Sequence, residues 1–91
     1  LSIPDWGATR FARQERRDVT AIAREIDGFN DIARDMCESR RIAFVDIRPV
    51  SRDDGDSDAM LADDGLHPSS AMYARWVDAA LPVAHRLLGD A

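Results

Sequence analysis

IAFVDI, residues 42–47, is a short apolar run with β-branched and aromatic side chains, and Pro49 follows it. Runs of this kind are typical of interior strands of parallel sheets, which are buried on both faces. LSIP at residues 1–4 has a similar character and is ended by Pro4. We therefore expect a buried strand at each of these two segments.

A long helical pattern separates the two predicted strands. Apolar residues recur at intervals of three and four between Glu15 and Arg40, which predicts one amphipathic helix. Gly28 interrupts the pattern at a cost of about 1 kcal/mol relative to Ala, so a close helix contact or a mild bend is expected there. A crossover of this length implies parallel strands and a right-handed connection. The apolar positions are Val19, Ile22, Ile26, Phe29, Ala33 and Met36.

A second helix is predicted after Pro68, which suits a first helical turn, with Ser69 and Ser70 as capping residues. Its apolar stripe runs from Met72 to Leu88, and Pro82 should kink or divide it. The order strand, helix, strand, helix predicts an α/β fold. Two parallel strands leave unpaired edges, so we expect further strands from a preceding part of the protein or from another chain.

Length and composition exclude several classes of protein. The chain has 91 residues with 45% hydrophobic and 32% charged side chains, which fits one small domain or part of a larger one. The net charge is −5 and the twelve basic residues, all Arg, are scattered, which disfavours a nucleic-acid partner. No apolar run approaches the roughly 20 residues of a transmembrane segment. No signal segment opens the chain, and Leu1 lies within an apolar run, so preceding sequence is expected and the compartment is left open.

The segment DGLHPS places Asp64 three residues before His67 in a turn that leads into the second helix. A carboxylate at that spacing can accept the Nδ1–H of the imidazole, fix its tautomer and leave Nε2 free as a general base. Pro68 restricts His67 to extended backbone, which helps to orient the ring. A common Asp-Gly turn followed by a surface His is the alternative, and spacing alone does not decide between them.

This segment resembles the D-x-x-H-P block of SGNH/GDSL hydrolases, and two upstream stretches are similar to segments of that family in the same order. LSIPDWG at residues 1–7 is similar to the strand and loop after the family's Asn block. FNDIA at 29–33 with RIAFVDI at 41–47 is similar to its penultimate helix and last strand. The resemblance covers nearly the whole chain.

The resemblance implies a flavodoxin-like three-layer α/β/α fold with a parallel sheet, of which residues 1–91 would be the C-terminal part of a single domain. It also implies hydrolysis of a small-molecule, lipid or sugar ester through a Ser acyl-enzyme, without a cofactor. His67 would take the Ser proton and Asp64 would orient His67. The family's Ser, Gly and Asn blocks precede the matched region, so the N-terminal part with the nucleophile would lie outside this chain. The chain alone is then expected to be inactive.

Trp6 and Phe11 follow the C-terminal end of a predicted strand, where α/β folds bind ligands, so we expect them to line an acyl pocket. Core packing is the alternative for both. The segment Gly55–Ser57 spells the family's nucleophile signature, but it lies in a polar loop ten residues before His67. We interpret it as a coincidence of an Asp-rich loop.

That loop, residues 51–66, raises the question of a calcium site. Counted from Asp54, the EF-hand template requires Gly and Glu where Ala59 and Gly65 stand, so we expect a solvated, mobile loop without a metal site, with weak cation binding as the alternative. The single Cys37 excludes an intrachain disulfide and is expected to be buried, whereas His85 is expected to be structural or exposed. Two non-enzymatic alternatives remain: a helical interaction module, and a fragment that associates with another copy through exposed apolar faces.

Overall fold

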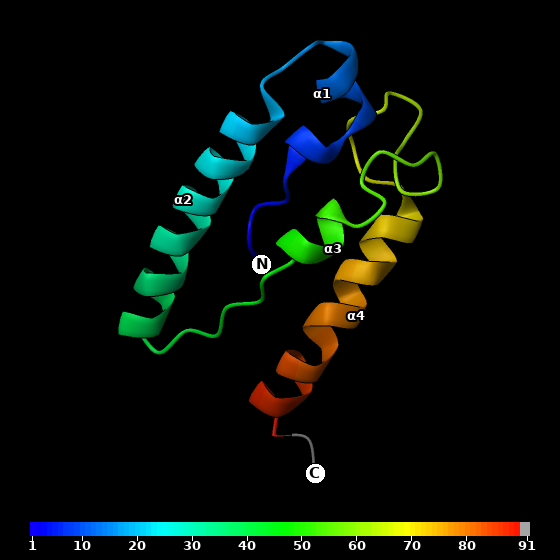
Figure 1. The fold of residues 1–91 in the computed structure, drawn as a ribbon. Helices are drawn as coiled ribbons and strands as arrows, with labels where there is room; N and C mark the ends of the chain where they lie inside the picture. The colour runs from blue at the N-terminus through cyan, green and yellow to red at the C-terminus, as the bar shows by residue number, and fades with distance from the viewer. Residues whose placement is uncertain (90–91) are drawn as a thin grey trace.

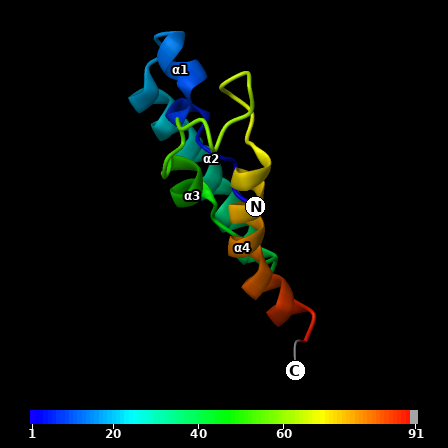
Figure 2. The same cartoon turned by 90° about the vertical axis from the view of Figure 1, so that its right-hand side faces the viewer.

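The computed structural model describes residues 1–89, and within them every regular element is a helix. Two long helices, α2 and α4, flank the N-terminal segment, the 3-10 turn η1 and the short helix α3 (Figure 1). Seen from the side, the layer is thin (Figure 2), with extents of 45 × 26 × 15 Å. The elements are η1 (Trp6–Ala8), α1 (Arg10–Gln14), α2 (Val19–Ser39), α3 (Arg48–Arg52) and α4 (Ser70–Leu87).

The prediction of a flavodoxin-like α/β/α fold with a parallel sheet is wrong for residues 1–89, which contain no strand and no sheet. Residues 1–4 and 42–47 have no regular secondary structure, and a single backbone hydrogen bond joins them, from the N–H of Ser2 to the carbonyl of Val45 at 2.8 Å. Within residues 1–89 the β pairing is limited to an isolated antiparallel bridge between Leu61 and Pro68.

Side chains take the place of the ladder that the sequence predicts. The Asn30 side chain on α2 accepts from the N–H of Ile3 at 2.7 Å and donates to its carbonyl at 2.9 Å. The Ser2 hydroxyl accepts from the N–H of Ile47 at 2.7 Å. Asn30 is only 1% exposed, and its two hydrogen bonds to Ile3 hold the N-terminal segment against α2. They take the place of the hydrogen bonds of a neighbouring strand.

The first predicted helix is confirmed, although it begins at Val19 instead of Glu15. Arg16 has a φ of 54° and separates α1 from α2, and the Asp18 carboxylate caps α2 by accepting from the N–H of Ala21 at 3.0 Å. Of the two alternatives predicted at Gly28, the close helix contact is wrong, because a Cβ placed there would meet no atom within 4 Å, and the mild bend stays a prediction. Cys37 is only partly buried.

The start of the second predicted helix is also confirmed. The Ser69 hydroxyl caps α4 by accepting from the N–H of Met72 at 3.3 Å. Pro82 does not divide α4, which continues to Leu87. Pro49 lies in the first turn of α3, where the sequence predicted the end of a strand.

Much of the apolar stripe on each long helix is exposed, since a layer this thin has room for few buried side chains. Buried hydrophobic residues lie on five separate parts of the chain, whereas Phe29 on α2 is 67% exposed and Val77 on α4 is 54% exposed. Within residues 1–89 no helix combines the length and the apolar character that crossing a membrane requires. The buried hydrophobic residues are Ala12, Ile26, Ile47, Leu61 and Met72.

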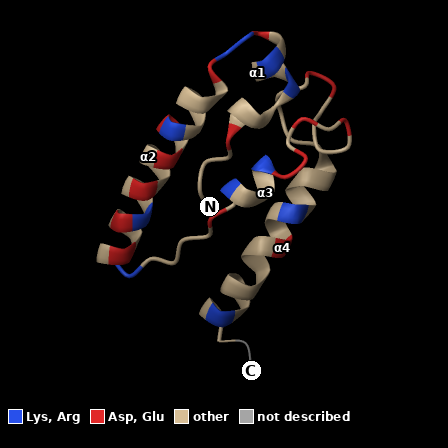
Figure 3. Cartoon of the chain, in the orientation of Figure 1, with Lys and Arg blue, Asp and Glu red and all other residues tan. Residues whose placement is uncertain are grey.

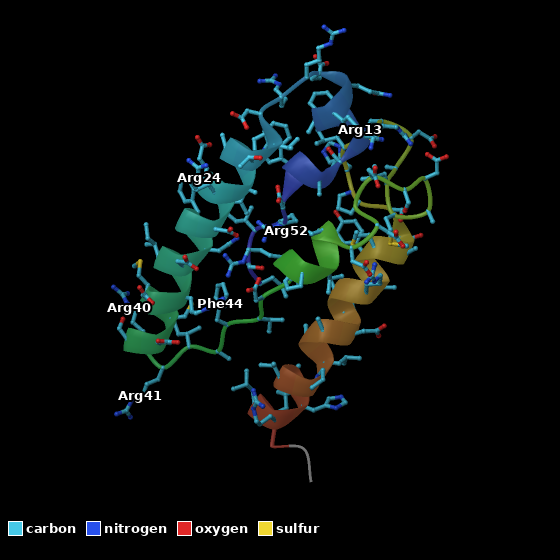
Figure 4. The ribbon with its side chains drawn as sticks, viewed as in Figure 1. Arg13, Arg24, Arg40, Arg41, Phe44 and Arg52 are labelled. Carbon is cyan, nitrogen blue, oxygen red and sulfur yellow. The ribbon has the colours of Figure 1, made fainter. Side chains whose placement is uncertain are left out.

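The N-terminal segment lies between α2 and α3 (Figure 3), and arginine–aspartate pairs join α3 to both of them. The Arg48 side chain is 7% exposed and contacts Asp46 at 2.8 Å and Asp27 of α2 at 3.1 Å. Arg52, the last residue of α3, lies on the side of α3 toward the N-terminal segment (Figure 4) and contacts Asp5 at 2.8 Å and Asp27 at 2.9 Å. The hydrogen bond from the Arg48 side chain holds the pKa of Asp46 well below its usual range.

Candidate active site

A closed turn over residues 60–69 carries the Asp and His that the sequence singles out. The N–H of Ala62 donates to the carbonyl of His67 at 2.7 Å, and the N–H of Ser69 donates to the carbonyl of Met60 at 3.0 Å. Gly65 reverses the chain with a φ of +73°, a conformation that L side chains rarely adopt. Because Ser69 is also the cap of α4, the turn is fixed to the start of a long helix.

Asp64 and His67 are joined within this turn. Nδ1 of His67 lies 2.5 Å from Oδ2 of Asp64, while Oδ1 accepts from the N–H groups of Leu66 and His67, each at 2.9 Å. An ionised carboxylate only accepts hydrogen bonds, so Nδ1 carries the proton in this contact. The contact that the spacing predicts is present, and a catalytic role for the pair stays a prediction.

The pair faces solvent. The side chain of His67 is 71% exposed and that of Asp64 is 49% exposed. With Nδ1 engaged by Asp64, Nε2 is the ring nitrogen available to a reacting group. The backbone N–H of Leu66 and the His67 ring lower the pKa of Asp64 to about 2, so the carboxylate is ionised at neutral pH.

Acid is expected to remove the stabilising contribution of Asp64 between about pH 4 and pH 2. Its pKa in the folded chain, about 2, lies below the ordinary value of 3.8, so the contribution is complete above about pH 4 and is lost as the pH falls through 2. The difference in free energy of unfolding between wild type and Asp64→Asn, measured in urea at each pH, should shrink over that window. Asp63→Asn, at the exposed neighbouring position, is the control. A difference that stays constant down to pH 2 would contradict this assignment.

Trp6 and Phe11 contact each other, with ring centroids 6.5 Å apart. Trp6 lines a small apolar pocket of about 60 Å³, together with Leu66 and Pro68, and Phe11 is not part of its lining. His67 lies between two lining residues, Leu66 and Pro68, but does not line the pocket itself. Trp6 therefore lies close to the turn residues Leu66 and Pro68, and a role of Trp6 and Phe11 in an acyl pocket stays a prediction.

Ser57, the last residue of the signature-like segment, lies among turns and not at the start of a helix. Its hydroxyl oxygen is buried without a hydrogen-bond partner, and Gly55 is buried as well. A buried hydroxyl oxygen is not accessible to a substrate, which supports the interpretation of the Gly55–Ser57 segment as a coincidence.

The residues that surround the turn from outside were not predicted. Arg10 of α1 packs on Gly65, and the N–H of Phe11 donates to the Gly65 carbonyl at 3.0 Å. The Asp-rich loop, expected to be merely solvated, pairs with arginines that lie far away in the sequence, and such pairing has no periodic signal. The ion pairs are Arg10–Asp58, Arg13–Asp56 and Arg75–Asp53.

No group of three or more His, Cys, Asp or Glu in the described chain is placed to hold a metal ion.

The family model of the GDSL-like Lipase/Acylhydrolase family matches residues 2–75, a range that includes both Asp64 and His67. The chain therefore belongs to the GDSL-like lipase/acylhydrolase family, and the family resemblance drawn from its motifs is confirmed. At that level its general function is acyl hydrolysis. Comparison with curated proteins and with solved structures gave no match.

Proposed function

We propose that residues 1–91 form the C-terminal part of an acylhydrolase domain and contribute Asp64 and His67 to the hydrolysis of carboxylic esters through a Ser acyl-enzyme. One observation carries the proposal: a carboxylate fixed by two backbone N–H groups binds Nδ1 of an exposed imidazole at 2.5 Å. That arrangement orients a general base before the substrate arrives.

In the proposed reaction, Nε2 of His67 takes the proton of a Ser hydroxyl as the Ser oxygen attacks the ester carbonyl. The same nitrogen then gives the proton to the departing alcohol, and water repeats the sequence to release the acid. Asp64 stays ionised throughout and stabilises the imidazolium, a role that its low pKa supports. The Ser and the oxyanion-hole groups are assigned to the preceding part of the domain, because the family resemblance orders its blocks in that way.

A second candidate, self-association without catalysis, is favoured by the exposed apolar side chains of α2. Phe29, Ile32 and Met36 are each more than half exposed, and a partner surface would bury them. This property does not explain why a turn should hold His67 by its Nδ1 atom. The family match and the geometry of the turn favour the hydrolase.

A fluorophosphonate probe tests where the nucleophile lies. We expect the 91-residue chain to keep its unlabelled mass, and the protein that joins it to the preceding segment to gain one adduct on a Ser outside residues 1–91. Ser57→Ala in the longer protein should be labelled like wild type, because the hydroxyl of Ser57 is buried. Labelling of the 91-residue chain on Ser57 would overturn the division of the site between the two parts.

A further inference from the structure

The turn that holds Asp64 and His67 is supported from outside by the start of α1. The N–H of Phe11 donates to the carbonyl of Gly65 at 3.0 Å. The Thr9 hydroxyl caps α1 by accepting from the N–H of Ala12. The N–H of Phe11, which has no partner within the first helical turn, is therefore available to the turn that contains Gly65. Two segments more than 50 residues apart in the sequence are therefore fixed to each other beside the candidate pair (Figure 1).

Arg10 covers the same glycine. A Cβ at Gly65 would lie 3.0 Å from Nε of Arg10 and 3.2 Å from its Nη2, so the guanidinium rests directly on the α-carbon side of the turn. The Arg10 side chain is only 26% exposed, and its far end forms an ion pair with Asp58 of the Asp-rich loop. Asp58 thus fixes the direction in which the Arg10 side chain lies.

Gly65 is the link between this support and the candidate pair. It follows Asp64 directly, and the two N–H groups that bind Oδ1 of Asp64 belong to the next two residues, Leu66 and His67. A shift of the Gly65 peptide would move those donors relative to the carboxylate. The contact between Oδ2 of Asp64 and Nδ1 of His67 would change with them.

We propose that Arg10, held by Asp58 and packed on Gly65, is a positioning residue that keeps the Asp64–His67 turn in the geometry that presents the His67 ring. Its meaning for catalysis rests on the proposed function, whereas its effect on the ring does not. Arg10 acts through Gly65 and does not touch the reacting atoms. Arg13 provides a matched comparison, because it lies on the same helix and pairs with Asp56 of the same loop at 2.5 Å without covering Gly65.

Nitrogen-15 NMR of the histidine rings tests the proposal on the 91-residue chain at about pH 9, where an ordinary imidazole is neutral. The ring signals of His67 are assigned by their loss in His67→Ala. In wild type we expect the Nδ1–H tautomer. Arg10→Ala should give a mixture of tautomers and raise the pKa of Asp64 from about 2, while Arg13→Ala should leave both unchanged.

Two further variants keep the test decisive. Asp58→Asn removes the ion pair at an exposed side chain and should shift the tautomers in the same direction by a smaller amount, even if Arg10→Ala fails to fold. Arg10→Lys keeps the ion pair but not the planar contact, and should restore only part of the wild-type spectrum. Ring spectra and Asp64 titrations that are the same in Arg10→Ala, Asp58→Asn and Arg13→Ala would overturn the proposal.

Activity separates this proposal from the proposed function. In the protein that carries the nucleophile, Arg10→Ala should lower kcat by about tenfold to a hundredfold with KM unchanged, because misplacement of a catalytic group by about 1 Å has effects of this size. Altered ring spectra in Arg10→Ala together with full hydrolysis by His67→Ala would refute the proposed function and leave the positioning role standing. Loss of hydrolysis in His67→Ala with unaltered Arg10→Ala spectra would do the reverse.

Discussion

His67→Ala is expected to lower kcat for ester hydrolysis by about 10⁶-fold in the protein that joins residues 1–91 to the proposed nucleophile, the size of loss seen when the base of a serine triad is removed. The variant lacks the imidazole that takes the Ser proton in the proposed reaction. The fold should be retained, because the His67 side chain is 71% exposed and Asp64 keeps its two backbone N–H donors. Steady-state hydrolysis of an activated ester and thermal unfolding measure the two effects separately.

His85→Ala is the matched control, since it removes the other imidazole of the chain from the last turn of α4. It should hydrolyse the ester at the wild-type rate. Asp64→Asn should lose up to about 10⁴-fold, because an amide can no longer stabilise the imidazolium or enforce the Nδ1–H tautomer. Wild-type turnover by His67→Ala would refute the proposed function, and equal losses in the two His variants would point to damage of the fold instead.

Local sequence patterns predict the local parts of this structure. The apolar spacing predicts α2 and α4, the segment Pro68–Ser69 predicts the cap of α4, and the three-residue spacing predicts the contact of Asp64 with His67. Each of these depends on residues within about one or two helical turns of each other, where spacing determines which side chains can meet.

The sheet was wrongly predicted because the two apolar runs specified neither burial nor a partner strand: Leu1 is 66%, Ile3 48% and Ile42 57% exposed. A strand also needs neighbours along its length, and residues 42–47 have one backbone hydrogen bond to the N-terminal segment. Asn30 and Ser2 satisfy the backbone groups of these segments instead, and both partners lie at least 27 residues from the groups they bind. Nothing in the periodicity of α2 marks Asn30 as the residue that binds Ile3.

The same reason explains what was missed around the candidate site. Gly65 is recognisable from sequence as a turn residue, but the packing of Arg10 on it joins residues 55 positions apart. The assignment of Trp6 to an acyl pocket stays a prediction, but the strand from which it was argued is absent from the described chain. The position of Trp6 close to the turn follows from the packing of η1 near α3, which no local pattern encodes.

Arg48→Ala is expected to lower the free energy of unfolding by about 3 kcal/mol, near the lower end of the range for breaking a buried ion pair. The variant removes the buried guanidinium that contacts both Asp46 and Asp27, while Arg34 and Arg52 keep their more exposed contacts with these carboxylates. The lower end applies because the Asp46 side chain is 29% exposed, so water can solvate part of the charge that Arg48 leaves. Urea unfolding of the 91-residue chain at neutral pH measures the loss.

Arg34→Ala is the matched control, because Arg34 contacts the same Oδ2 atom of Asp46 at 3.0 Å but is 39% exposed. An exposed pair of this kind contributes about 1 kcal/mol or less, so the two variants should differ by at least about 2 kcal/mol. At low pH the difference should shrink, since Arg48 lowers the pKa of Asp46 and protonation of that carboxyl removes the charge that Arg48 neutralises. Equal losses in Arg48→Ala and Arg34→Ala would mean that the network is solvated throughout, and that Asn30 and Ser2 hold the N-terminal segment without it.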